Sequence, residues 1–182
     1  MNRRNATWML GVVLALVGVQ RGFASEETDQ LLRAANNSVA AASSAVQEAR
    51  FAIEKGKKLV LQVPADSDLG KEIEQVLTQA SQSWDAALLA LSDAKKSAAK
   101  VGSAKNEAIA KDYKLLATST SSLALAGAKS VQASIFFIES VAGNTDSIGV
   151  ARVAVQDALA GAEKVEKRCN QVKVLIAKKY SK

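Results

Sequence analysis

The chain has 182 residues, a formal net charge of +6, one cysteine, one proline and no histidine. Without histidine it cannot form a Ser-His or Cys-His nucleophile pair, and one cysteine cannot supply the ligands of a structural zinc site. Haem and di-iron sites in helical bundles also depend on histidine or methionine, and both methionines, Met1 and Met9, lie in the N-terminal segment expected to be removed, so we expect no cofactor, no metal and no enzymatic activity. Aromatic residues make up 4% of the chain, too few for the base-stacking surfaces of nucleic-acid-binding proteins.

Residues 1–24 have the pattern of a secretory signal peptide. Arg3 and Arg4 precede an apolar run over 9–19, and small residues follow up to Ala24. We expect cleavage after Ala24, with an uncleaved anchor as the alternative, although the run is shorter than the ~20 residues that span a bilayer. Of the 24 basic residues 21 follow Ala24, with all 18 acidic ones, so the exported part would carry +3. The predicted location is secreted, cell-surface-associated or periplasmic, with no membrane-spanning helix after signal removal.

From residue 27 to 61, apolar residues recur at alternating spacings of three and four. This spacing places them along one face of a helix and repeats every seven residues, as in coiled coils. These residues form two rows. One row has large side chains, at Leu32, Val39, Val46, Ile53 and Val60, and the other has small ones, at Ala35, Ala42, Ala49 and Gly56. Because small residues let a neighbouring backbone approach closely, the pattern predicts a helix packed tightly along one face.

Three more helices are predicted, over 67–101, 104–142 and 146–180. Alanine favours helices, and the single proline leaves long segments unbroken. The predicted breaks hold proline, glycine or capping residues, namely Pro64 with Asp66 and Ser67, Gly102 with Ser103, and Gly143 with Asn144 or Thr145. The helix over 104–142 is apolar around much of its circumference, which predicts neighbours on several sides.

Residues 25–182 are therefore expected to form one all-α domain. Helices of similar length with short connections favour an elongated, antiparallel four-helix bundle with alanine-rich, coiled-coil-like packing. If Gly102 does not interrupt the chain, the second and third helices fuse, and a three-helix rod results instead.

Cys169 falls in the apolar stripe of the last predicted helix. At that position it is predicted to be a small, buried hydrophobic residue. The alternative is an intermolecular disulfide or a reactive thiol.

In an antiparallel bundle, the first and third helices begin at the pole where the second and fourth end. Fourteen basic and nine acidic residues are expected at this pole. We predict that nine of the basic residues form a patch for an anionic surface, either phospholipid head groups or polysaccharide. They are Lys95, Lys96, Lys100, Lys105, Lys167, Arg168, Lys173, Lys178 and Lys179. The alternative is ordinary solvated charge, with lysines matching the dipoles of helix C-termini.

Two polar features stand out within the predicted helices. Asn36 begins an Asn-x-Ser triplet, which is a glycosylation acceptor in the eukaryotic secretory pathway. The run Thr-Ser-Thr-Ser-Ser over 118–122 interrupts an apolar helix. Its hydroxyls are expected to bond to carbonyls of the preceding turn or to permit tight packing, with a buried polar ligand site as the alternative.

The predicted function is that of an exported, non-catalytic helical bundle that acts through contacts with a protein or a surface. Oligomers are possible, because the apolar stripes can also pair between chains. The alternative is a carrier that holds a small apolar ligand in the bundle interior. Its predicted lining is Trp84, Leu88, Tyr113, Phe136 and Phe137.

In composition and architecture, a leader followed by long alanine-rich helices resembles the helical surface and secreted proteins of trypanosomes. It is equally similar to small periplasmic helical-bundle proteins of bacteria. The resemblance rests on no matched residue, so it implies an exported helical protein and assigns no site.

Overall fold

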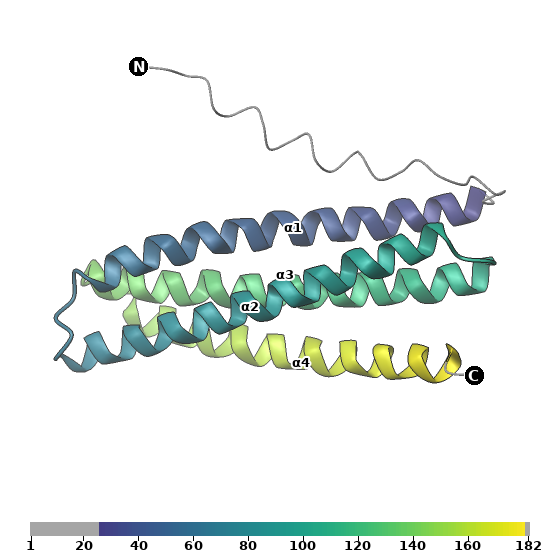
Figure 1. The fold of residues 1–182 in the computed structure, drawn as a ribbon. Helices are drawn as coiled ribbons and strands as arrows, with labels where there is room; N and C mark the ends of the chain where they lie inside the picture. Colours follow the sequence, from purple (N-terminus) through teal and green to yellow (C-terminus); the bar gives the residue numbers. More distant parts are fainter. Residues whose placement is uncertain (1–25, 181–182) are drawn as a thin grey trace, which may run out of the picture.

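The computed structural model describes residues 26–180, and all the regular structure in that range is helical. The four helices are α1 (Glu26–Val60), α2 (Asp68–Gly102), α3 (Glu107–Ala142) and α4 (Ile148–Tyr180). Successive helices run in opposite directions along the long axis of the molecule (Figure 1). The prediction of an all-α, antiparallel four-helix bundle is confirmed. The predicted signal peptide and its cleavage at Ala24 fall outside the described residues.

The connection between α2 and α3 decides between the predicted four-helix bundle and the alternative three-helix rod. α2 ends at Gly102, and the N–H of Ala104 donates to the carbonyl of Val101 at 3.3 Å. α3 then begins at Glu107, because the side-chain oxygen of Asn106 accepts from the N–H of Ile109 at 3.0 Å. This capping bond satisfies one of the unpaired N–H groups of the first helical turn. The rod alternative is therefore wrong, and the helix start predicted at 104 is three residues early.

The other two connections also end in local hydrogen bonds. Ser67 caps α2, as its Oγ accepts from the N–H of Gly70 at 2.9 Å. After α3, Asn144 takes a left-handed conformation with φ 46°, and the N–H of Thr145 donates to the carbonyl of Ser140 at 3.1 Å. The chain needs this extra turn before α4, which explains why α4 begins two residues after the predicted position.

The small row of α1, rather than the large one, lies deepest in the bundle. Ala35, Ala42 and Ala49 have no exposed surface, whereas Leu32 and Val39 remain partly exposed. The backbone of α1 therefore lies closest to its neighbours at these alanines, and its larger side chains pack at the sides of this contact.

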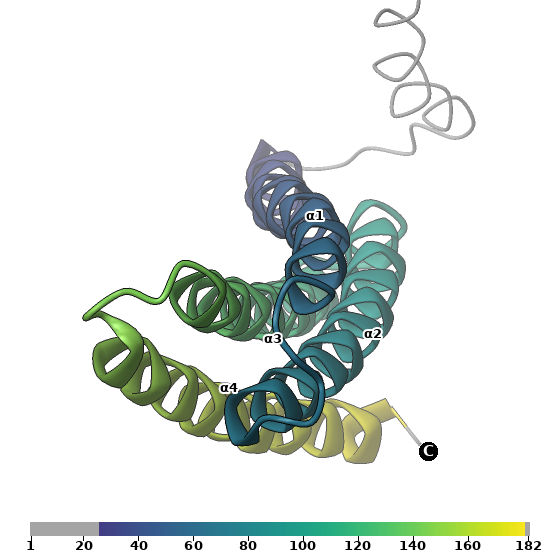
Figure 2. The same ribbon diagram turned by 90° about the vertical axis from the view of Figure 1, so that its left-hand side faces the viewer.

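α3 is the central helix, in contact with α1, α2 and α4. No Cα atom of α4 lies within 8 Å of one in α1 or α2. Since directly packed helices have axes only ~8–10 Å apart, α4 packs on α3 alone. Figure 2 shows α1 and α4 on opposite sides of α3, so much of the circumference of α4 faces away from the bundle.

α3 is also the one helix within residues 26–180 that is long and apolar enough to span a membrane by length and composition. More than half of its most apolar stretch is buried inside the bundle. The core helix of a bundle has this composition because it is covered on several sides, as the sequence pattern predicted.

The side chain of Cys169 is buried, with 1% of the residue exposed, which confirms its predicted place in the core. Burial raises the pKa of the thiol, and the thiolate is the reactive form. We therefore expect alkylation of the native protein by iodoacetamide to be at least about tenfold slower than alkylation in denaturant. Mass spectrometry of samples quenched over time measures both rates. Equal rates, or a covalent dimer on a non-reducing gel, would contradict the buried position.

Candidate anionic-surface site

The nine basic residues of the predicted patch lie on three segments at one pole of the bundle. These segments are the end of α2, the α2–α3 connection and the last part of α4, which Figure 1 shows at the same end of the molecule. The antiparallel arrangement thus brings together residues that are far apart in the sequence. The individual side chains, however, do different things there.

Two of the nine hold α4 in place. Lys173 Nζ lies 2.8 Å from Asp93 Oδ2 on α2, and this bond raises the pKa of Lys173. Lys179 Nζ lies 2.5 Å from Asp112 Oδ2 on α3. Hydrogen bonds from Lys179 and from the Tyr180 hydroxyl lower the pKa of the Asp112 carboxyl. Both lysines are occupied within the fold, so they contribute less to an external anion than the pattern suggested.

A second ion pair completes a regular link between α2 and α4. Arg152 Nε and Nη2 each donate to the carboxylate of Glu72 at 2.7 Å, and this bidentate pair lowers the pKa of Glu72. Arg152 and Lys173 are three heptads apart on α4, as are Glu72 and Asp93 on α2. The two parallel helices therefore run in a constant register, joined by long side chains where their backbones do not touch.

Lys100 lies against an aromatic pair. Its Nζ is 5.2 Å from the centroid of the Tyr113 ring, and that ring stacks on Tyr180 with centroids 5.9 Å apart. A cation over an aromatic face is attracted by the ring electrons. This cluster joins the ends of α2, α3 and α4 at the basic pole.

The other residues of the patch are exposed. Lys95, Lys96, Lys105, Lys167 and Arg168 are all exposed, and none forms an ion pair with another residue in 26–180. Lys178 is exposed as well. Since each residue turns a helix by about 100°, Lys96 shares a stripe with Lys100, while Lys95 lies on a different side of α2. Lys95, Lys96, Lys105, Lys167 and Arg168, rather than all nine, form the surface available to an anion.

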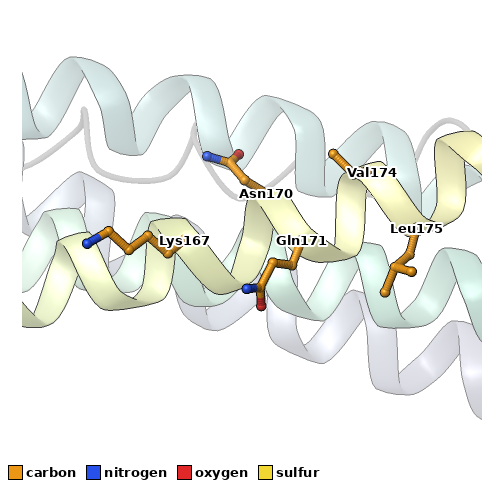
Figure 3. Close-up of a pocket in the computed structure, with 5 residues that line it drawn as sticks. All are labelled: Lys167, Asn170, Gln171, Val174 and Leu175. Carbon is orange, nitrogen blue, oxygen red and sulfur yellow. The ribbon is translucent and has the colours of Figure 1, made fainter.

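The outward face of α4 carries a shallow, open groove of about 680 Å³. Five residues line it, namely Lys167, Asn170, Gln171, Val174 and Leu175. In Figure 3, Asn170 and Val174 point to one edge of this face, and Gln171 and Leu175 point to the other. Because one helix supplies all five residues, the groove is a surface feature and not an enclosed cavity.

Sequence reasoning missed Val174 and Leu175. Their exposed fractions are 52% and 67%, and they lie beside four basic residues, Lys164, Lys167, Arg168 and Lys178. A signal was present, because both residues lie off the apolar stripe that contains Cys169 and Ile176. We define the α4 face by these six residues, Lys164, Lys167, Arg168, Val174, Leu175 and Lys178.

The five residues of the predicted carrier site do not surround a common space. Tyr113 and Phe137 are 24 residues apart on α3, or about 36 Å along a helix that rises 1.5 Å per residue. Trp84 is used in packing, as its Nε1 donates to the carbonyl of Val46 on α1 at 3.1 Å. Leu88 and Phe136 are exposed, at 39% and 44%. The carrier hypothesis therefore has no shared cavity among these residues on which to rest.

The structure shows where the two polar features of the predicted helices lie, namely Asn36 and the hydroxyl-rich run over 118–122. Asn36 is exposed on α1, where a glycan would not displace the core, although glycosylation itself stays a prediction. In the 118–122 run, the Thr120 hydroxyl donates to the carbonyl of Leu116 and that of Ser122 to Thr118, as expected. The hydroxyls of Thr118 and Ser121 are buried without a hydrogen-bond partner in the described part of the chain.

The α4 face presents fixed positive charge beside exposed aliphatic groups. Within residues 26–180, no group of three or more acidic or cysteine side chains is arranged to hold a metal ion. Comparison with protein-family models, with curated proteins and with solved structures finds no match to this chain.

Proposed function

We propose that the protein is an exported, non-catalytic helical bundle that attaches to a negatively charged surface through its basic pole. The observation that carries this proposal is the exposure of Lys96, Lys167 and Arg168 at one pole without ion pairs to other residues of the described range 26–180. Clustered exposed cations attract phosphate, sulfate or carboxylate groups, and the attraction weakens as salt screens it. The signal-peptide pattern supports export, and the missing histidine supports a role without catalysis.

Charge reversal tests the proposal. We expect the double substitution K167E/R168E to weaken binding to heparin and to anionic phospholipid vesicles by at least about tenfold at low salt, because each basic residue near such a surface contributes ~1 kcal/mol. Affinity chromatography and vesicle co-sedimentation over a salt series measure the change.

The matched control is K58E/K71E, which makes the same change in net charge at the opposite pole. Lys58 lies at the end of α1 and Lys71 at the start of α2, and both are exposed. This variant is expected to keep most of the affinity. If the unmodified protein binds neither polyanion at low salt, or if both variants lose affinity equally, attachment through the basic pole is wrong.

A further inference from the structure

The exposed aliphatic pair on α4 distinguishes between the anionic surfaces that the basic pole could meet. Val174 and Leu175 stand on the outward side of the helix, while Cys169 and Ile176 hold the opposite side in the core with exposures of 1% and 8%. α4 is therefore fixed in rotation, and it presents both aliphatic side chains to the outside together with four basic residues.

We propose that the α4 face lies flat on an anionic phospholipid bilayer. Lys164, Lys167, Arg168 and Lys178 would sit at the level of the phosphates, and Val174 and Leu175 would enter the boundary with the acyl chains. A helix with basic and aliphatic residues on one exposed face has the composition of an interfacial membrane helix. This inference rests on the proposed function and names its surface.

The aliphatic pair is the reason to choose lipid over polysaccharide. A sulfated or carboxylated sugar chain would engage the cations but would leave Val174 and Leu175 in water. A bilayer removes both side chains from water while its phosphates meet the cations, so it accounts for both the aliphatic and the basic residues of the α4 face.

A second copy of the chain fits this face poorly. In a two-fold dimer the same patch meets itself, so the four basic residues would approach their own counterparts. The nearest acidic residues on α4 are Glu163 and Glu166. Glu166 lies two turns before Lys173, on the stripe that faces α2, so Glu163, one turn before Lys167, would be the one acidic residue of α4 beside the face to pair with four cations across such an interface.

Vesicle flotation tests the inference. The probes are vesicles of phosphatidylcholine alone and vesicles with about 30% phosphatidylserine, whose negative surface attracts basic residues. We expect binding to the anionic vesicles, and a drop of at least about tenfold in their partition coefficient for V174Q/L175Q, because two exposed aliphatic groups are lost from the contact. Retention of this variant on heparin should be unchanged, since no cation is removed.

The matched control is F51Q/L61Q, on α1 and on the connection that follows it. Phe51 and Leu61 are 65% and 86% exposed, and α1 lies on the opposite side of α3 from α4, so this variant replaces two exposed apolar side chains far from the α4 face. It is expected to bind vesicles like the unmodified protein. Unchanged melting curves by circular dichroism would show that both variants remain folded.

The outcomes separate the inference from the function on which it rests. If V174Q/L175Q floats like the unmodified protein, or if only F51Q/L61Q loses binding, the lipid contact is not the α4 face, while salt-sensitive heparin retention would still support attachment through charge. If the unmodified protein binds neither heparin nor anionic vesicles, the proposed function fails first.

A fluorescence measurement reports the depth of the contact directly. For L175W we expect tryptophan emission to move to shorter wavelength with anionic vesicles and to stay unchanged with heparin. F51W, on the far side of the bundle, should show no shift with either. Emission from L175W that does not respond to vesicles to which the protein binds would overturn insertion of this side chain.

Discussion

Replacing Phe137 with alanine is expected to lower the free energy of unfolding by about 3–5 kcal/mol, the usual cost of truncating a fully buried phenylalanine. Phe137 is 1% exposed and belongs to the largest hydrophobic cluster of the bundle. The guanidinium carbon of Arg152 on α4 lies 5.5 Å from the centre of its ring, so the truncation also removes a contact between α3 and α4. Denaturant titration followed by circular dichroism measures the loss.

Its neighbour Phe136 supplies the matched control. Consecutive residues of a helix point about 100° apart, and Phe136 retains 44% of its exposed surface. F136A should therefore cost clearly less than F137A, about 1–2 kcal/mol, because nearly half of Phe136 stays in water on folding. If F136A and F137A destabilise the protein equally, the rotation of α3 about its axis is wrong.

The heptad pattern and the capping residues explain why the four helices could be predicted. Apolar spacing marks the buried face of each helix, and serine, asparagine and glycine mark its ends, so both signals are local in sequence. The central place of α3 was also foreseeable, since its apolar residues occupy more than one face. The errors of three residues at the start of α3 and two at the start of α4 arose where an extra local turn precedes the helix.

The sequence pattern could not show which row of α1 would lie deepest. Both rows share one face of the helix, and the choice depends on how closely α3 approaches. Gly56 shows the closeness, because a Cβ placed there would lie 2.5 Å from Cδ1 of Ile135. Such distances depend on the partner helix, which local spacing does not describe.

Local sequence patterns also could not predict which basic side chains of the candidate site form ion pairs within the fold. Lys173 and Lys179 had the same sequence context as Lys167, yet they pair with carboxylates 80 and 67 residues away. Only the register between helices decides which lysines are occupied. The same register leaves Val174 and Leu175 exposed, because α4 packs on α3 without a second helix across its outer face.

The central position of α3 depends on a close approach between α2 and α3. A Cβ added at Gly127 would lie 2.9 Å from both the Cβ of Ala87 and the carbonyl oxygen of Ser83. The second contact is with backbone, so relief requires α2 to move. We expect G127V to lower the free energy of unfolding by about 1–3 kcal/mol through overpacking, and G127A to fall between it and the unmodified protein.

Gly161 on α4 isolates the effect of packing from that of helix propensity. It also lies inside a helix, but a Cβ added there would meet no atom within 4 Å. G161A should therefore stabilise the protein by up to about 1 kcal/mol, the difference in propensity between glycine and alanine, and raise the melting temperature by about 2–4 °C. If G127A lowers the free energy of unfolding and G161A raises it, the α2–α3 interface is tight and the outer side of α4 is open. If both substitutions stabilise the protein, the α2–α3 backbones are further apart than described; if both destabilise it, the outer side of α4 is covered.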